Sequence, residues 1–401
     1  MTEPISGLAV VPPGLEAPAA AELTALGAHA VVPLRRAVRF QTDLAGFYRL
    51  HLQARLPFRL LRELTHFPCS GKDDLYDGVQ TAVDWLHWLP PEASFRVDAS
   101  GSAPGLNHSH YSALQVKNAI VDLQRQHWGA RSSVNLDDPD LAIHLHLGNA
   151  REGGNSRPGG YGNARQGQPE ATLSLDGSGG SLHRRGYRAA MGLAPLKENL
   201  AAGLIALTGW DGSVPLADPL CGSGSLLIEA ACSALGRAPG LERSFALERW
   251  PDFDAALWAQ ERQQALSLAR ETCRGGQPLA AVIGMEQDPG VLDQAQANAD
   301  AAGVAPWLDL RLGDCRDFQP PNEAGILVCN PPYGERIGER DALEPLYADL
   351  GRMVKERCSG WSLWLLSGNP ELTGALKMKA TRRIPVSNGG IDCRWLLYEI
   401  R

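Results

Sequence analysis

The sequence predicts an α/β protein in which a mostly parallel sheet, with helices on both faces, follows a smaller α+β region. The chain has 401 residues, which is too long for one ordinary hydrophobic core and predicts two or three domains. From residue 171 to the end, strand-like apolar runs alternate with helical patterns, as they do in parallel sheets. A glycine-rich turn at residues 221–224 joins one of these strands to a helix, which is typical of the ligand-binding edge of such a sheet.

The first 149 residues contain short strands and helices in mixed order. His144 and His146 alternate with apolar residues, a period of two that indicates a strand. Two histidines on one strand face could hold a metal, but with no third ligand nearby we expect a packed or solvated face and no metal site. The expected strands are 7–11, 37–41, 94–99 and 141–147, and the expected helices are 18–27, 42–51 with the segment beyond it, 75–86 and 112–126.

A glycine-rich segment then separates the two parts of the chain. Residues 149–170 hold six glycines and two prolines without apolar periodicity, so we expect a flexible loop or linker. Beyond it, seven strands are expected to form the mostly parallel sheet. They are 171–176, 214–218, 280–286, 308–312, 325–330, 361–366 and 395–400, with helices at 195–207, 225–235, 254–272, 290–302 and 344–355.

The composition is that of a soluble globular protein, with 44% hydrophobic and 21% charged residues. No apolar run reaches the roughly 18 residues that a membrane helix needs. The acidic N-terminus lacks the basic lead of a signal peptide, so we expect a cytoplasmic protein without a membrane partner. The eight cysteines form no C-x-x-C pair, which predicts reduced thiols and neither a zinc site nor a redox motif.

Basic residues are concentrated locally although the net charge is −7. Residues 31–72 contain eight basic and two acidic side chains, and a second group of arginines lies at 184–188. Such patches can follow the phosphates of a nucleic acid while the rest of the protein stays acidic. They can equally be solvated helix faces, and the charges alone leave both interpretations open.

The first chemical motif is the stretch DPLCGSGS, which begins at Asp218 between an apolar strand and an apolar helix. A glycine-rich turn at a strand end lets a ligand approach the backbone closely. Leu227 stands where a dinucleotide fingerprint would have its third glycine, so the pattern favours an S-adenosylmethionine site. Cys221 lies in this turn, Gly222 and Gly224 leave room for the cofactor, and Asp218 is expected to face its methionine ammonium.

Two further acidic motifs follow the next two strands. Glu286 stands at a strand end, where a carboxylate can accept both ribose hydroxyls of a nucleoside, whereas Asp288 is expected to cap the following helix. Asp314 follows the next strand and can accept a hydrogen bond from the adenine amino group. The first two motifs lie too far apart for a simple βαβ unit, so residues 236–279 are expected to be an insertion with its own helix.

The sharpest motif is Asn330-Pro331-Pro332-Tyr333 at a strand end. Two prolines cannot continue a ladder, so the chain leaves the sheet rigidly and presents the Asn330 side-chain oxygen and the Pro331 carbonyl at the ligand-binding edge. Two fixed acceptors suit an aromatic amino group, and holding both protons directs the nitrogen lone pair at a methyl carbon. Tyr333 offers a face for a base taken out of its stack.

In this order, the motifs resemble those of class I methyltransferases that act on amino groups. Longer stretches are similar to the THUMP-containing guanine-N2 RNA methyltransferases, in particular the methyltransferase half of the bacterial 23S ribosomal RNA enzymes. These stretches are LSLDGSGGSLHRRGYR, APLKENLAAGLIALTGW, DPLCGSGSLLIEAA, RAPGL and NPPYGERIG, with YSALQVKNAIVDLQR and DDPDLAIHLHL resembling the THUMP domain itself.

The resemblance covers nearly the whole chain and implies a domain order. It implies a ferredoxin-like lead at 1–42, a THUMP RNA-binding domain at 43–149, a linker at 150–170 and a Rossmann-like catalytic domain at 171–401. It further implies guanine N2 as the target atom, in 23S ribosomal RNA or transfer RNA. The residues it places on RNA phosphates, besides the basic lead, are Lys117, Arg184, Arg185 and Arg188.

This sequence departs from the resemblance in three ways, and it leaves rival functions open. Ser225 replaces the more usual threonine, the segment 150–170 is long, and the sequence has one catalytic domain where some relatives have two. A DNA adenine-N6 methyltransferase and a non-catalytic RNA-binding assembly factor are the alternatives. A nucleophilic Cys329 would imply methylation at a pyrimidine carbon, but its apolar strand without a basic partner favours a core residue.

Overall fold

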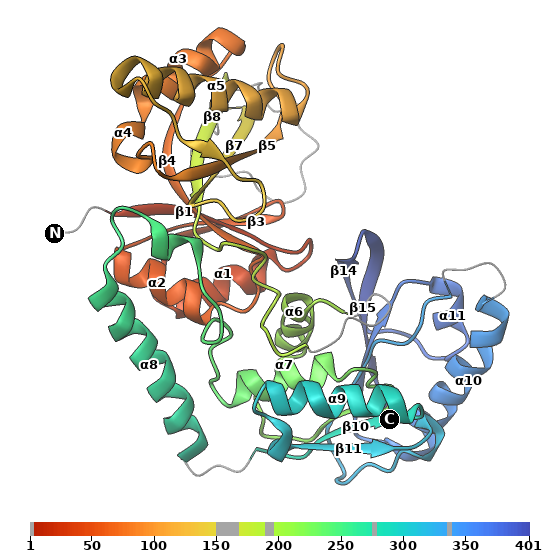
Figure 1. Cartoon of the computed structure of the whole chain (residues 1–401). Coiled ribbons are helices and arrows are strands. Elements are labelled where there is room, and N and C mark those ends of the chain that lie inside the picture. Colours follow the sequence, from red (N-terminus) through yellow and green to blue (C-terminus); the bar gives the residue numbers. More distant parts are fainter. Residues whose placement is uncertain (1–3, 150–167, 189–195, 275–278, 335–338) are drawn as a thin grey trace.

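The computed structural model describes residues 4–149, 168–188, 196–274, 279–334 and 339–401. Within them, the strands form one sheet of eight strands and one of seven. Figure 1 shows the eight-stranded sheet in the N-terminal half, with the seven-stranded sheet and its helices beside it. No helix in the described part of the chain is long and apolar enough to cross a bilayer.

The first sheet has the strand order β2-β3-β1-β4-β8-β7-β5-β6. The expected strands 7–11, 37–41, 94–99 and 141–147 are present, and the unpredicted strands β2, β4 and β6 join them. The strands are β1 (Ile5–Val10), β2 (His29–Leu34), β3 (Ala37–Thr42), β4 (Arg59–Pro68), β5 (Ser94–Gly101), β6 (Ser133–Val134), β7 (Leu141–Asn149) and β8 (Pro169–Asp176). The helices are α1 (Glu16–Ala25), α2 (Leu44–Gln53), α3 (Lys72–Ala82), α4 (Trp85–Trp88) and α5 (Ser109–Trp128).

One expected helix is wrong beyond its first ten residues. Helix α2 ends at Gln53, and the segment that we expected to continue it contains β4, a central strand of the sheet. Strand β4 pairs antiparallel with β1 and with β8. The two adjacent buried leucines, Leu60 and Leu61, fit a helical period as well as a strand, so only the distant pairing partners decide between them.

The second sheet has the order β11-β10-β9-β12-β13-β15-β14. Strands β9 to β13 run parallel, and β15 is antiparallel to both of its neighbours. The strands are β9 (Leu216–Asp218), β10 (Val282–Glu286), β11 (Leu308–Leu312), β12 (Ile326–Cys329), β13 (Ser362–Ser367), β14 (Arg382–Asn388) and β15 (Ile391–Glu399). The helices are α6 (Glu198–Thr208), α7 (Ser225–Ala234), α8 (Ala255–Arg274), α9 (Pro289–Ala301), α10 (Glu339–Arg357) and α11 (Pro370–Gly374).

Seven strands were predicted for this sheet, but one member is wrong and one was missed. The expected strand at 171–176 is β8, which pairs antiparallel between β4 and β7 of the first sheet, so the predicted domain boundary at 171 falls inside a strand. Alternation along a strand shows which residues are buried but not which sheet buries them. The missed strand is β14, which contains Pro385 and exposed arginines. Proline lacks the N–H group of a ladder hydrogen bond, so it fits a strand such as β14 that lies at the sheet edge.

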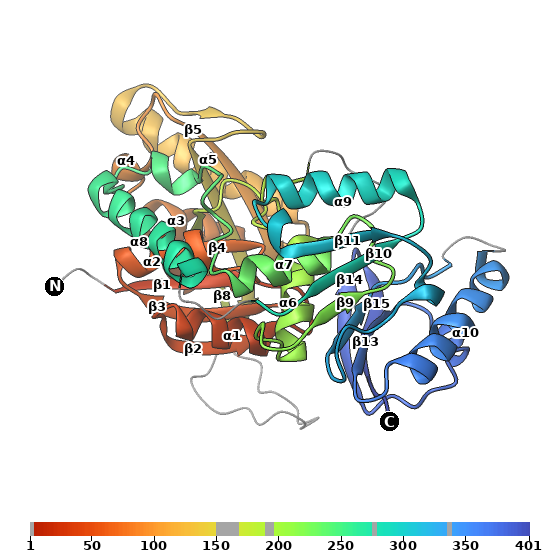
Figure 2. The ribbon, with the colours of Figure 1, turned by 90° about the horizontal axis from the view of Figure 1, so that it is seen from below.

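Helices cover both faces of the second sheet. Helices α7 and α9 pack on one face and α10 on the other; in Figure 2, α7 and α9 lie to the left of and above the strands, and α10 lies to their right. The chain passes from β9 to β10 and β11 on one side, then crosses to β12 and β13 on the other side. Such a reversal of strand order leaves a crevice at the carboxyl ends of the central strands, here β9 and β12.

The insertion predicted at 236–279 is present and carries α8. Figure 1 shows α8 lying away from the seven-stranded sheet and beside α2 of the N-terminal half. The guanidinium of Arg49 on α2 donates two hydrogen bonds, of 3.0 and 2.9 Å, to the carboxylate of Glu261 on α8. Glu261 is buried, so this ion pair fixes the insertion to the N-terminal sheet region.

Candidate functional site

The glycine turn predicted after Asp218 connects β9 to α7. Asp218 ends the strand and is buried, and its Oδ1 accepts a hydrogen bond of 3.0 Å from the backbone of Leu220. Gly222 and Gly224 have φ angles of 53° and 80°, in the left-handed region that glycine adopts without strain. A Cβ added to Gly222 would meet no atom within 4 Å, so open space adjoins the turn where a ligand could approach.

Glu286 links this turn to the end of β10. Its Oε2 accepts a hydrogen bond of 3.1 Å from the backbone N–H of Gly222, and its Oε1 accepts one of 3.0 Å from Asp288. The backbone N–H of Cys221 also bonds to the Met285 carbonyl at 2.9 Å. Asp288 accepts from Gly290 and Val291, so the prediction that it caps α9 is confirmed.

The carboxyl group of Asp218 is buried in surroundings where a positively charged ligand group would stabilise its ionised form. Burial raises its pKa from 3.8 to about 7, with the nearby charge of Glu286 adding to the rise. Its side-chain partners among the described residues are limited to the thiol of Cys329, whose Sγ lies 3.8 Å away. No cationic side chain of the described residues contacts it, so an ammonium group of a ligand fits this position.

Cys329 is a core residue, as predicted. It is fully buried at the end of β12, and burial together with the charge of Asp218 raises the pKa of its thiol well above the usual value. A thiol with a raised pKa is a poor nucleophile. Its contact with Asp218 does join the ends of β9 and β12, which brings the first and fourth motifs together at one edge of the sheet.

Asp314 lies after β11 and is paired with Arg316. Its Oδ1 accepts from the backbone and side chain of Arg316 at 2.9 Å each, and its Oδ2 lies 2.6 Å from the same guanidinium. This pairing lowers the pKa of Asp314 to about 2. The carboxylate is therefore ionised and partly exposed, and its oxygens face Arg316.

The proline corner directly follows β12. Pro331 is buried and Pro332 exposed, so the chain turns outward from the sheet at this dipeptide. The hydroxyl of Tyr333 donates a hydrogen bond of 2.6 Å to Oδ1 of Asn330. An acceptor oxygen thus stands at the end of β12, next to the strand end that carries Asp218.

Three residues that support this corner were missed from the sequence. The hydroxyl of Tyr347 donates to the Pro332 carbonyl at 3.0 Å, and the Asn369 amide donates to the Tyr333 carbonyl at 3.3 Å. Asn388, from the unpredicted β14, donates to the Tyr333 hydroxyl at 3.4 Å. Because they come from three separate elements, their only sequence signals are the cap pattern Asn369-Pro370 and the glycine pair after Asn388.

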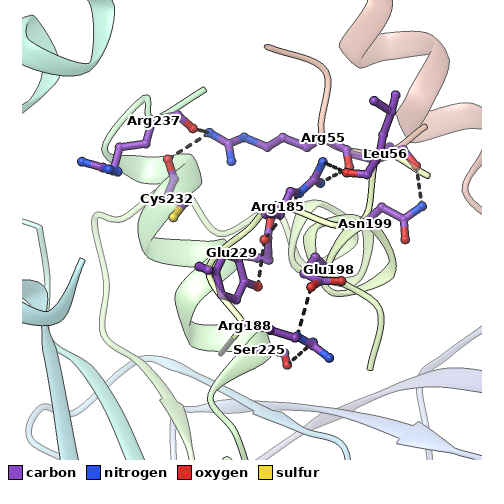
Figure 3. A network of polar contacts seen from close by, with 12 residues as sticks. Arg55, Leu56, Arg185, Arg188, Glu198, Asn199, Ser225, Glu229, Cys232 and Arg237 are labelled. Carbon is purple, nitrogen blue, oxygen red and sulfur yellow. Dashed lines mark hydrogen bonds and ion pairs between the residues drawn. The ribbon is translucent and has the colours of Figure 1, made fainter. Parts of the chain in front are cut away.

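The arginine group at 184–188 is turned largely into the protein (Figure 3). Arg185 is buried, and its Nε lies 3.7 Å from Glu229. Arg188 lies 3.0 Å from the buried Glu198 and donates a hydrogen bond of 2.8 Å to the hydroxyl of Ser225. The guanidiniums of these two arginines therefore face buried glutamates, and Arg184 is the exposed arginine of this group.

Several basic residues of the stretch 31–72 also make contacts within the protein. Four of its arginines contact other parts of the chain, whereas the exposed Arg184 and the half-buried Lys117 on α5 stay candidates for RNA. The contacts are Arg49 with Glu261, Arg59 with Asp176, Arg62 with Asp252, and Arg55 with the carbonyls of Cys232 and Arg237.

The parallel sheet with its reversal at β9, the glycine turn and the acidic strand ends define the class I methyltransferases that use S-adenosylmethionine. The family model described as "RMKL-like, methyltransferase domain" matches residues 185–396. A THUMP domain model matches residues 70–151, and an RlmL ferredoxin-like domain model matches residues 7–61. The chain belongs to this family of THUMP-containing, RlmL-like methyltransferases.

Curated relatives are similar to this chain over nearly its whole length. The Synechocystis protein "Putative RNA methyltransferase slr0064" is 41% identical, over 98% of this chain and 96% of its own length. The "Ribosomal RNA large subunit methyltransferase K/L" of Pseudomonas entomophila is 37% identical over 97% of this chain. This chain spans about half of the latter, 52% of its length.

Solved structures share the fold. SMU.472, crystallised with SAH (S-adenosylhomocysteine, what remains of S-adenosylmethionine after methyl transfer), is 28% identical with a TM-score of 0.83, over 100% of this chain and 99% of its own. A Listeria monocytogenes protein described as a "predicted N6-adenine-specific DNA methylase" is 29% identical with a TM-score of 0.84, over 100% and 97%. The cofactor of this chain is accordingly S-adenosylmethionine.

Proposed function

We propose that the chain transfers a methyl group from S-adenosylmethionine to the exocyclic N2 of a guanine in RNA, with 23S ribosomal RNA as the substrate and transfer RNA as the alternative. The observation that carries this proposal is the acceptor oxygen of Asn330. It stands at a proline-locked strand end, beside the strand end of Asp218. An amine bound to Asn330 therefore lies near a cofactor held over the glycine turn.

The residues of the site have separate roles in this proposal. When bound, the cofactor supplies an electrophilic methyl group on a sulfonium. Asp218 faces its ammonium, and Glu286 accepts its ribose hydroxyls in exchange for the backbone bonds seen here. Asp314 accepts from the adenine amino group. The turn containing Cys221, Gly222 and Gly224 leaves the space for the cofactor's methionine part.

The proline corner orients the nucleophile. Asn330 Oδ1 and the Pro331 carbonyl accept the two N–H groups of the amine, so the nitrogen lone pair leaves conjugation with the ring and points at the methyl carbon. The nitrogen–carbon bond forms as the carbon–sulfur bond breaks, and one amine proton leaves to water. Pro332 keeps the corner rigid and Tyr333 offers a stacking face, so the proposal requires neither a metal nor a covalent enzyme intermediate.

RNA as the substrate rests on the N-terminal half and on the relatives. A THUMP domain matches residues 70–151, and the curated relatives are named for RNA and ribosomal RNA methylation. The exposed Arg184 and the half-buried Lys117 are the proposed phosphate contacts. With ribosomal RNA as the substrate, the proposed location of the protein is the cytoplasm.

Adenine N6 in DNA is the second candidate, which the Listeria relative's description favours. One experiment separates the two candidates. The purified protein is incubated with S-adenosylmethionine labelled in the methyl group and with deproteinised 23S ribosomal RNA, transfer RNA or DNA, and the product is digested to nucleosides. We expect label in N2-methylguanosine from ribosomal RNA. Label in N6-methyldeoxyadenosine from DNA would support the second candidate, and no label in any nucleic acid would favour a non-catalytic assembly factor.

A further inference from the structure

Asn388 reaches the candidate site through a tight hairpin. Strands β14 and β15 are joined by Gly389 and Gly390, whose φ angles of 62° and 98° are both in the left-handed region. A two-residue turn with both φ angles positive is the connection that suits the twist of a hairpin, and it requires residues such as glycine. Asn388 pairs with Ile391 across this turn, so its position beside the proline corner is fixed by the strand register.

The hydroxyl of Tyr333 lies between two side-chain amides. It donates to Asn330 Oδ1 at 2.6 Å and accepts from Asn388 Nδ2 at 3.4 Å. Burial raises the pKa of Tyr333, so the hydroxyl keeps its proton and serves as the donor. A protein O–H group thus binds the oxygen that the amine of the target base needs.

Neighbouring side chains hold the backbone of this corner in place. The carbonyls of Pro332 and Tyr333 are bound by Tyr347 and Asn369. One face of the Tyr333 ring lies against Gly368, where an added Cβ would come within 2.7 Å of the ring. Exchange of the hydroxyl for a base therefore requires rotation of the Tyr333 side chain but leaves Asn330 and Asn388 in place.

We propose that the Tyr333 hydroxyl holds the place of the target amine, and that Asn388 contacts the base once the amine replaces this hydroxyl at Asn330. The inference rests on the proposed function and adds a residue that orients the base. An amine on a purine ring has a ring nitrogen acceptor beside it, N3 in guanine and N1 in adenine. The Nδ2 group of Asn388 complements that acceptor, and enzymes read flipped bases by hydrogen bonds of this kind.

The test compares steady-state kinetics of the full chain on deproteinised 23S ribosomal RNA. Asn388→Ala and Asn388→Asp both remove the donor, so each should raise KM for RNA roughly tenfold, the effect of one lost hydrogen bond. KM for S-adenosylmethionine should stay at the wild-type value. Ser387→Ala, one residue earlier on the same strand, is the matched control and should leave both constants unchanged.

Tyr333→Phe tests the other half of the inference. It removes the competing hydroxyl but keeps the ring, so it should lower KM for RNA several-fold. A KM for RNA in Asn388→Ala equal to that of the wild type, or a raised KM in Tyr333→Phe, would overturn the inference while an active wild type upholds the proposed function. A wild-type protein that methylates no nucleic acid would refute both. If the wild type methylates adenine in DNA, the same variants are compared on DNA, where the same shifts are expected.

Discussion

At the carboxyl edge of the second sheet, single residues have polar or charged side chains whose partners differ from those that a bound ligand would provide. Asp218 is a buried carboxyl group without a cationic partner among the described residues, and the oxygen of Asn330 is bound to a hydroxyl of its own corner. Groups in such environments are common at functional sites, because a ligand supplies the missing partner.

Cofactor affinity should depend on pH through Asp218. With a pKa of about 7, this carboxyl group is mostly protonated at pH 6 and ionised at pH 8. An ammonium prefers the ionised form, so affinity for S-adenosylhomocysteine should be roughly tenfold weaker at pH 6 than at pH 8, following proton linkage. Titration calorimetry at both pH values measures this. Asp218→Asn should bind weakly with little dependence on pH, and equal wild-type affinities at both pH values would contradict the assignment.

The same raised pKa should affect the stability of the cofactor-free protein in the opposite direction. The contribution of Asp218 to stability is fully present below pH 3.8 and is lost as the pH rises through about 7. Cofactor-free Asp218→Asn should therefore gain stability relative to the wild type between pH 5 and pH 8. Urea unfolding of both proteins at these pH values tests this, and a constant difference across that range would count against it.

Replacement of Asn330 should impair catalysis without impairing cofactor binding. Asn330→Ala removes one preorganised acceptor, which should lower kcat on the order of 10²-fold or more. The dissociation constant of S-adenosylhomocysteine should stay unchanged, because Asp218 and the glycine turn are untouched. Asn322→Ala, an exposed asparagine on the loop before β12, is the control. Normal turnover by the Asn330 variant would remove this residue from the mechanism.

At the scale of elements, two arginines that precede α6 connect the helices α6 and α7. Arg188 precedes α6 and contacts both Glu198 at the start of α6 and Ser225 at the start of α7 (Figure 3). Arg185 approaches Glu229 in the middle of α7. The glycine turn is thus held from its helical side by residues that the sequence suggested for RNA.

Loss of Arg188 should destabilise the protein. Arg188→Leu leaves the buried Glu198 without its partner, which typically costs about 3–5 kcal/mol of unfolding free energy. Because Ser225 adjoins the glycine turn, cofactor affinity should fall as well. Urea unfolding and calorimetry measure the two effects. Arg184→Leu, at an exposed neighbouring arginine, should unfold like the wild type, and equal stability of both variants would show that the ion pair contributes nothing.

The elements show what could be predicted from the sequence. Local signals sufficed for the cap of α9, the turn after β9 and the corner after β12, because each depends on residues that are adjacent in the chain. Strand β8 was assigned to the wrong sheet and β14 was missed, because their partners are distant or their faces exposed. The contacts of Arg185 and Arg188 with Glu229 and Glu198 could not be predicted, because charge patterns do not reveal which side chains face the interior.

At the scale of the whole molecule, the insertion after α7 binds the two halves together. Arg62 pairs with Asp252, Arg249 with Asp138, and Phe47 stacks on Trp250 at 6.1 Å between ring centroids. These contacts link the insertion to strands and helices of the first sheet region. We therefore expect the N-terminal half and the catalytic half to move as one body around this insertion.

Breaking the ion pair of α8 should loosen this connection. Glu261→Ala leaves Arg49 without its partner, and because Arg49 is partly exposed the expected cost is about 1–3 kcal/mol. Amide hydrogen exchange should accelerate in α2 and α8 while the strands β9 and β12 stay protected. Gln264→Ala on the exposed side of α8 is the control. Unchanged exchange in α2 would mean that the insertion does not hold the two halves.

The place of β8 constrains how the N-terminal half can be isolated. Strand β8 lies between β4 and β7 and pairs with both of them, so it connects the two parts of the first sheet. A fragment ending at residue 149 would lack β8, so the edges of β4 and β7 would have unpaired backbone N–H and C=O groups. Exposed strand edges of this kind promote aggregation. A fragment extended to Asp176 restores the missing ladder. Pull-down or gel-shift work with the RNA-binding half should therefore use the longer fragment, although most of its added length lies outside the THUMP match.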